Sequence, residues 1–128
     1  MLSEAEVIRI VREHFEKLFP KVCPNCHRHF ATLREYILAT KRIGKPHSYD
    51  AEAGDWNTPV PVGTLTDANC PCGSTLTLST EGMPLPRRLQ LLDWVQFETK
   101  RQGVDSSELL DHLRDVVRQQ VLADDAAP

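Results

Sequence analysis

The sequence predicts an α+β fold, in which a stapled β-hairpin and a small helix are flanked by an N-terminal helix and a C-terminal antiparallel helical hairpin. Three observations support this prediction. The only four cysteines in the 128 residues stand in two close pairs, Cys23 with Cys26 and Cys70 with Cys72. Alternating polar and apolar residues follow the second pair, as in a β-hairpin. Apolar residues at helical spacing occupy both ends of the chain.

The N-terminal helix is expected over residues 2–19. Ser3 and Glu6 form a capping-box pattern at its start, and Pro20 ends it because proline cannot continue the hydrogen-bond ladder. The apolar side chains of this helix recur at intervals of three and four residues. They are Ile8, Val11, Phe15 and Leu18.

A second helix is expected over residues 30–41, shortly after the first cysteine pair, and Gly44 with Pro46 beyond it stops the helix. The polar segment over 45–60 is rich in turn-forming residues, so we interpret it as a loop. An edge strand near Trp56 stays open as an alternative. The apolar face of the helix consists of Phe30, Leu33, Ile37 and, less regularly, Tyr36.

Two strands are expected over residues 62–69 and 74–80, on either side of the second cysteine pair. In the second strand, Leu76 and Leu78 alternate with polar residues. The segment Cys70-Pro71-Cys72-Gly73 therefore forms the predicted tip of a hairpin, where Gly73 supplies a backbone conformation that other residues rarely adopt.

A third helix begins near Pro86, which suits the first helical turn, and runs to about Gln102, with Gly103 at its C-terminal boundary. Trp94 and Phe97 lie off its main apolar stripe. They either cover the N-terminal helix or form a surface for a partner. The main stripe consists of Leu85, Leu89, Leu92 and Val95.

A fourth helix begins with the capping pair Asp105 and Glu108 and runs to about Leu122. Because only two or three residues join it to the third helix, we expect the two helices to form an antiparallel hairpin. Its apolar stripe consists of Leu110, Leu113, Val117 and Val121.

We expect a single domain over residues 1–128. Its expected parts are the N-terminal helix (1–20), a metal-binding module (21–82), the helical hairpin (83–122) and a frayed tail (123–128).

The net charge of −3 argues against nucleic acid as the main partner, since nucleic-acid-binding domains are usually basic. No apolar stretch approaches the roughly 20 residues of a membrane span, and the polar N-terminus lacks the features of a signal peptide. We therefore expect a cytoplasmic protein without a membrane partner. In that compartment paired cysteines bind metal more often than they form disulfides.

The spacing C-x2-C and C-x-C predicts one tetrahedral metal site made by Cys23, Cys26, Cys70 and Cys72. Zn²⁺ is the expected ion, and iron, which also accepts four cysteines, stays open. His27 or His29 replacing a cysteine ligand is a further alternative. The C-x-x-C-H pattern of haem attachment is present, but it leaves the second pair without a role.

In these knuckles the chain resembles zinc-ribbon proteins, in which two cysteine knuckles, one on a β-hairpin, share a zinc ion. The resemblance covers about residues 22–80 and rests on the four cysteines with their proline and glycine neighbours. The second pair is C-x-C rather than C-x-x-C, and the helix expected after the first pair is closer to a treble-clef arrangement. The resemblance implies metal binding and no particular activity.

We expect no enzymatic activity and no catalytic residue, because four thiolates close the coordination sphere of the metal. The expected role is an interaction or regulatory module whose amphipathic helices bind a protein partner or a second copy. A thiol or zinc redox sensor is one alternative. A nucleic-acid-binding ribbon is another, with a small basic cluster formed by Lys41, Arg42 and Lys45. We interpret that cluster first as a helix C-terminus, where cations complement the dipole.

The adjacent cations Arg87 and Arg88 have no such explanation. They stand at the predicted start of a helix, where the dipole disfavours positive charge. We expect them to pair with acidic neighbours or with a partner.

Overall fold

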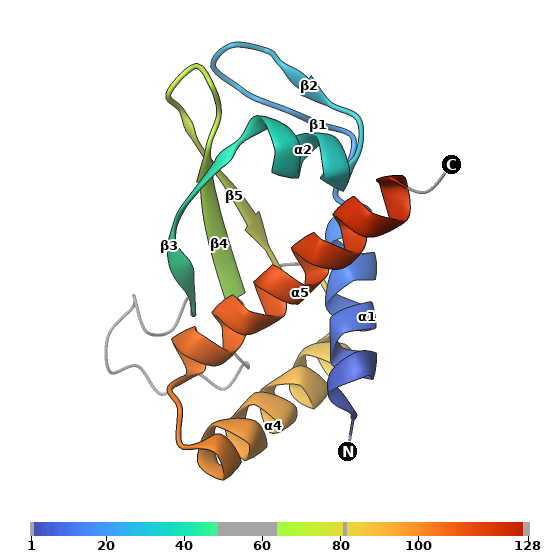
Figure 1. Ribbon diagram of the computed structural model, residues 1–128, viewed down its shortest axis with the longest axis vertical. Helices are drawn as coiled ribbons and strands as arrows, with labels where there is room; N and C mark the ends of the chain where they lie inside the picture. The colour runs from blue at the N-terminus through green and yellow to red at the C-terminus, as the bar shows by residue number, and fades with distance from the viewer. Residues whose placement is uncertain (1, 49–63, 81, 127–128) are drawn as a thin grey trace.

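The computed structural model describes residues 2–48, 64–80 and 82–126, and these form an α+β fold (Figure 1). Two small antiparallel sheets occupy one end of the molecule, and α5 runs diagonally past them beside α1. The elements in chain order are α1 (Glu4–Glu16), β1 (Lys21–Val22), β2 (His29–Phe30), α2 (Leu33–Ala39), β3 (Lys41–Ser48), β4 (Thr64–Asn69), β5 (Thr75–Ser79), α4 (Leu85–Gln102) and α5 (Ser106–Ala126).

Helix α1 starts as predicted, because the Ser3 side chain accepts a hydrogen bond of 3.2 Å from the backbone N–H of Glu6. Its buried residues include Val7 and Ile8, which face the core. The helix ends at Glu16, three residues before the expected end at Phe19. Helix ends are the least certain part of any sequence-based assignment.

The predicted helix after the first cysteine pair is present as α2, but the sequence missed the short hairpin that carries the pair. Strands β1 and β2 pair antiparallel on either side of these cysteines, with Lys21 opposite Phe30. Helix α2 begins only at Leu33, after the Thr32 side chain accepts a hydrogen bond from the Glu35 backbone N–H. Strands of two residues are too short to show alternation in a sequence, so only the Thr32/Glu35 capping pattern marked the true helix start.

The expected end of the second helix near Lys41 is wrong, and residues 45–48 of the expected loop belong to a strand. The rest of that loop, 49–60, lies outside the described residues. The backbone becomes extended at Thr40, and β3 runs from Lys41 to Ser48 beside β4. Its register shifts between Ile43 and His47, a stretch that contains Pro46, which has no N–H for the ladder. The strand is set by its pairing with β4 and not by a local pattern. The suggested strand near Trp56 lies outside the described residues.

The predicted hairpin around the second cysteine pair is confirmed. Strands β4 and β5 pair from Leu65 opposite Ser79 to Asn69 opposite Thr75. In β5, Leu76 and Leu78 are buried while the threonines beside them are exposed. The three-stranded sheet has the order β3-β4-β5, which leaves the β4–β5 turn free to face the β1–β2 turn.

The C-terminal helical hairpin is confirmed as well. Helix α4 ends at Gln102 and is capped by Gly103, whose φ of 70° is left-handed. At the start of α5, the Asp105 side chain accepts a hydrogen bond of 2.8 Å from the Glu108 N–H. Helix α5 continues to Ala126, past the expected end at Leu122, so most of the predicted frayed tail is helical. The buried stripe of α5 consists of Leu109, Leu113, Val117 and Val121.

The predicted buried stripe of α4 is wrong. Leu85 and Leu89 are 45% and 42% exposed, and Phe97 is 49% exposed, whereas Trp94 is 2% exposed and joins the core. The second buried residue of α4 is Glu98, one turn after Trp94. Because a charged residue lies on the buried face, the spacing of apolar residues does not identify that face as buried. Much of the apolar surface that the pattern identified therefore stays uncovered.

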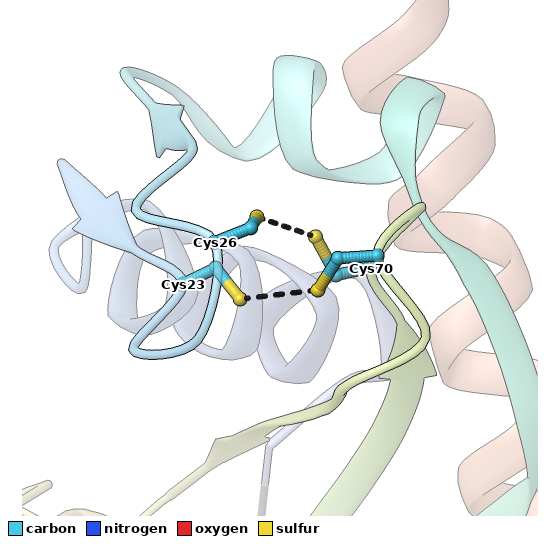
Figure 2. A group of neighbouring side chains, drawn as sticks. Cys23, Cys26 and Cys70 are labelled. Atoms are coloured by element: carbon cyan, nitrogen blue, oxygen red, sulfur yellow. Dashed lines mark hydrogen bonds between the residues drawn. The ribbon is translucent and has the colours of Figure 1, made fainter.

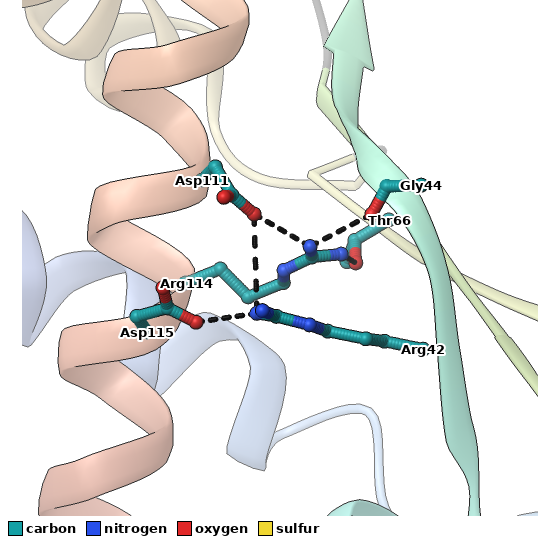
Figure 3. A network of polar contacts seen from close by, with 6 residues as sticks. All are labelled: Arg42, Gly44, Thr66, Asp111, Arg114 and Asp115. Atoms are coloured by element: carbon teal, nitrogen blue, oxygen red, sulfur yellow. Dashed lines mark hydrogen bonds and ion pairs between the residues drawn. The ribbon is translucent and has the colours of Figure 1, made fainter.

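Arg42 and Arg114 connect α5 to the three-stranded sheet (Figure 3). Arg42 on β3 pairs with Asp115 of α5, and its Nη1 lies 3.9 Å from Asp111. Arg114 bonds to Asp111 at 2.6 Å and to the Thr66 hydroxyl at 3.1 Å. The interpretation of the basic cluster as a helix C-terminus is therefore wrong, because Arg42 lies on a strand and has acidic partners.

None of the helices in the described part of the chain is both long enough and apolar enough to cross a membrane.

Candidate metal centre

The first cysteine pair lies on the tight turn between β1 and β2. The Cys23 N–H donates to the Arg28 carbonyl at 2.9 Å, and the His27 N–H donates to the Cys23 carbonyl at 2.9 Å. His27 has a φ of 63°, so the residue after Cys26 is left-handed. This conformation lets the chain reverse while Cys23 and Cys26 point to the same side.

The second pair lies on the turn between β4 and β5 and repeats this design in a shorter form. The Cys70 N–H donates to the Ser74 carbonyl at 2.8 Å, and the Gly73 N–H donates to the Cys70 carbonyl at 2.8 Å. Gly73, directly after Cys72, has a φ of 96°. The one-residue gap between these cysteines is therefore matched by a turn that is one residue shorter.

The four sulfur atoms form one cluster. Figure 2 shows Cys23 and Cys26 facing Cys70 across the space between the two turns. The Sγ atoms of Cys23 and Cys72 are 3.8 Å apart, those of Cys26 and Cys70 are 3.6 Å apart, and all four lie within 4.8 Å of one another. Four sulfurs bound to one zinc at about 2.3 Å with tetrahedral angles would be about 3.8 Å apart.

The cysteines are free thiols, because these sulfur separations far exceed the length of a disulfide, about 2.05 Å. One cysteine of each pair is buried, Cys23 at 0% and Cys70 at 2% exposure, while Cys26 and Cys72 are exposed. The cluster therefore has one side against the core and one side toward solvent.

The pKa values of the cysteine thiols differ because their hydrogen bonds and burial differ. The Ser74 hydroxyl and backbone N–H, with the Asn25 amide at 3.6 Å, lower the pKa of Cys72 to about 5. A backbone hydrogen bond from Cys72 favours the Cys70 thiolate, yet burial and the neighbouring sulfurs raise the pKa of Cys70 to about 12. The chain alone thus favours negative charge on one sulfur and opposes it on another. A divalent cation would supply the charge needed to hold all four as thiolates.

The structure brings together all four predicted cysteines, and neither predicted histidine joins them. Within the described residues, the group of potential ligand atoms contains Cys23, Cys26, Cys70 and Cys72 alone. His27 and His29 are exposed and do not belong to this group. The haem-attachment interpretation does not fit, because both sulfurs of the C-x-x-C-H pattern face the second pair.

Four converging thiolates would fill the coordination sphere of a tetrahedral ion and leave no position for a substrate. Such a centre holds a fold together, because the metal joins segments that weak contacts alone would leave separate. Here it would connect the turn after β1 to the turn after β4. This arrangement suits a structural role.

Comparison with known proteins gives no match: no family model fits the chain, and neither a curated protein nor a solved structure resembles it significantly. Its function is therefore inferred from the residues and their arrangement.

Proposed function

We propose that the protein is a non-enzymatic interaction module, in which a structural zinc ion bound by the four cysteines stabilises the fold and exposed helical surfaces bind a protein partner or a second copy. The observation that carries the zinc assignment is the sulfur cluster, whose Sγ–Sγ distances of 3.6 Å and 3.8 Å match a tetrahedral zinc site.

A single ion is favoured over an iron–sulfur cluster. Because the ligands of a cluster bind different irons, their sulfurs stand further apart than the ligands of one ion. The four sulfurs here all lie within 4.8 Å of one another. Zinc is favoured over a single iron ion because four-cysteine structural sites of this kind most often contain zinc.

The interaction role is supported by the uncovered apolar side chains of α4. Leu85, Leu89 and Phe97 are each more than 40% exposed on one helix. Clustered exposed apolar side chains often mark binding surfaces. Catalysis at the metal is disfavoured because the four thiolates leave no open position.

The zinc proposal is tested by elemental analysis of the purified chain, which we expect to give one zinc per chain. Cys23→Ser and Cys70→Ser should lose the metal, whereas His29→Ala should retain it at full stoichiometry. Zinc absent from the wild type, or replaced by iron, would contradict the proposal.

The interaction proposal needs a separate test at α4. Light scattering after size exclusion, together with capture of partners from extract, should show an assembly that Leu89→Glu or Phe97→Glu disrupts while zinc stays bound. A zinc-loaded wild type that remains monomeric and captures nothing would rule this role out.

A redox or metal sensor is a second candidate, favoured by the exposure of Cys26 and Cys72. Exposed thiolates released from zinc can be oxidised to disulfides. Peroxide should then release zinc with loss of ordered structure, and zinc that survives millimolar peroxide would exclude this candidate. The nucleic-acid alternative is weakened because Arg42 is engaged by Asp111 and Asp115.

A further inference from the structure

A cleft of about 260 Å³ lies between helices α1, α4 and α5. Figure 1 shows α4 at the end of the molecule away from the β1–β2 and β4–β5 turns. Its walls are mostly apolar, and each of the three helices contributes to them. The apolar side chains that define it include Val7, Val11, Leu92, Val95, Leu110 and Leu113. Leu92 and Val95 of the predicted α4 stripe line this cleft, whereas the exposed Leu85 and Leu89 do not.

Among the described residues, one cation lines the cleft. Arg88, in the first turn of α4, has a buried Nε atom with no hydrogen-bond partner. The other described polar residues lining the cleft are uncharged and are Thr80, Gln96, Thr99 and Ser106. A buried guanidinium nitrogen without an acceptor is costly, and the helix dipole adds to the positive potential at this end of α4. Both effects favour an anion beside Arg88.

Arg87 provides a contrast at the neighbouring position. Its side chain is exposed and donates to the Gln90 amide oxygen at 3.3 Å. Of the two adjacent cations, only Arg88 lines the apolar cleft.

The dimensions of the cleft suit a small apolar molecule. A cavity of about 150 Å³ holds the six carbons of benzene, so about 260 Å³ has room for roughly ten carbons. Residues 88 and 99 lie about 16 Å apart along α4 at 1.5 Å per residue. An extended aliphatic chain therefore fits between them.

We propose that this cleft binds a monocarboxylate with an apolar tail, such as a medium-chain fatty acid. The carboxylate accepts hydrogen bonds from Arg88, and the tail lies between Val95 of α4 and Leu110 of α5. A single charge at one end of an apolar wall matches a ligand with a single charge at one end of an apolar chain. This inference does not depend on the zinc ion or on a protein partner.

The test is a titration of the zinc-loaded full chain with decanoate below its micellar concentration, followed by amide NMR. Decanol serves as the uncharged analogue. Arg88→Met removes the charged group, Arg87→Met is the matched control, and Val95→Phe fills the cleft. Amide spectra of each variant without ligand confirm that it is folded.

We expect saturable decanoate binding that shifts the amides of Val95 and Leu110. R88M should weaken it roughly ten- to a hundredfold, the usual value of a charge-assisted hydrogen bond. R87M should leave it unchanged, and V95F should abolish it. Decanol should bind the wild type more weakly than decanoate does. The affinity for decanol should change little in R88M.

Three results would overturn the proposal. One is the absence of saturable binding by the folded wild type. The second is an equal loss in R87M and R88M, which would indicate surface charge alone. The third is a wild-type dimer that V95F dissociates and that decanoate does not affect, which would assign the cleft to a second copy of the chain.

Discussion

Arg114 of α5 donates a hydrogen bond of 2.8 Å to the backbone carbonyl of Gly44 on β3. The same guanidinium contacts Asp111 and the Thr66 hydroxyl, so one side chain joins a helix to two strands (Figure 3). The Arg114 side chain is only 16% exposed, which limits the access of water to these bonds. Arg114 thereby holds α5 against the sheet that carries the second cysteine turn.

Arg114→Met should therefore destabilise the fold. The variant keeps much of the apolar stem but leaves Asp111 and the Gly44 carbonyl without this donor, and we expect a loss of about 1.5–3 kcal/mol. The measurement is urea unfolding of the zinc-loaded protein. Arg118→Met is the matched control on α5, where the side chain is exposed, and it should change stability by less than about 0.5 kcal/mol. Equal effects of the two variants would contradict this role for Arg114.

Substitutions at His27 and Gly73, the residues after Cys26 and Cys72, should change the stability of the fold in opposite directions. Gly73→Ala should cost about 1 kcal/mol, because its φ of 96° is unfavourable for any residue with a Cβ. His27→Gly should cost nothing or stabilise by up to about 1 kcal/mol, because glycine relieves the same strain at φ 63°.

Thermal unfolding in the presence of zinc measures both changes, and zinc analysis accompanies it. Both variants should keep one zinc per chain. Loss of zinc from the His27→Gly protein would instead show that the imidazole takes part in metal binding.

The cysteine site was the most predictable part of this chain. Paired cysteines with adjacent proline, and Gly73 after the second pair, constrain the local backbone so strongly that sequence alone predicted the four cysteines that converge and the second turn. The meeting of the two turns was not derivable locally, because it depends on packing between segments far apart in the chain. Buried Phe30 and Leu76, one beside each turn, belong to the same core cluster.

The elements that the sequence missed are those whose structure is determined by distant contacts. Strand β3 contains glycine and proline and lacks alternation, yet pairing with β4 makes it a strand. The buried face of α4 was missed because Glu98 occupies it. That carboxylate is accommodated by Arg101 and Gln102 on the same helix, and periodicity counts apolar residues without recognising such a pair.

Removal of zinc should release the first hairpin while the helices remain folded. Strands β1 and β2 share only two residue pairs, Lys21 with Phe30 and Val22 with His29, and an isolated hairpin is at best marginally stable in water. The helices pack through Trp94, Leu113 and other buried residues that are distant from the cysteines along the chain.

Trp94 fluorescence in a Trp56→Phe background, where it is the only tryptophan, reports on the helical core. Addition of a strong chelator should leave its emission maximum and most of the helical circular dichroism unchanged. Amide resonances of residues 21–30 should lose dispersion and recover when zinc is restored. A red-shifted Trp94 emission on chelation would show that the metal supports the whole fold.

Glu98 should make a pH-dependent contribution to stability. Hydrogen bonds from Arg101 and Gln102, and the charge of Arg101, hold the pKa of this carboxyl below its ordinary value of 4.5. A carboxyl with a lowered folded-state pKa stabilises the fold above its unfolded pKa, and this contribution disappears as the pH falls through the folded value. Glu98→Gln should therefore be less stable than the wild type at pH 7, and the difference should shrink below about pH 4.5.

The measurement is the difference in melting temperature between wild type and Glu98→Gln from pH 7 to pH 3, in one buffer series. Acid also releases a metal bound by cysteines, but this affects both proteins equally and cancels in the difference. Asp93→Asn, an exposed position on the same helix, should show no such trend. A wild-type advantage that stays constant down to pH 3 would mean that Glu98 acts through packing rather than through its charge.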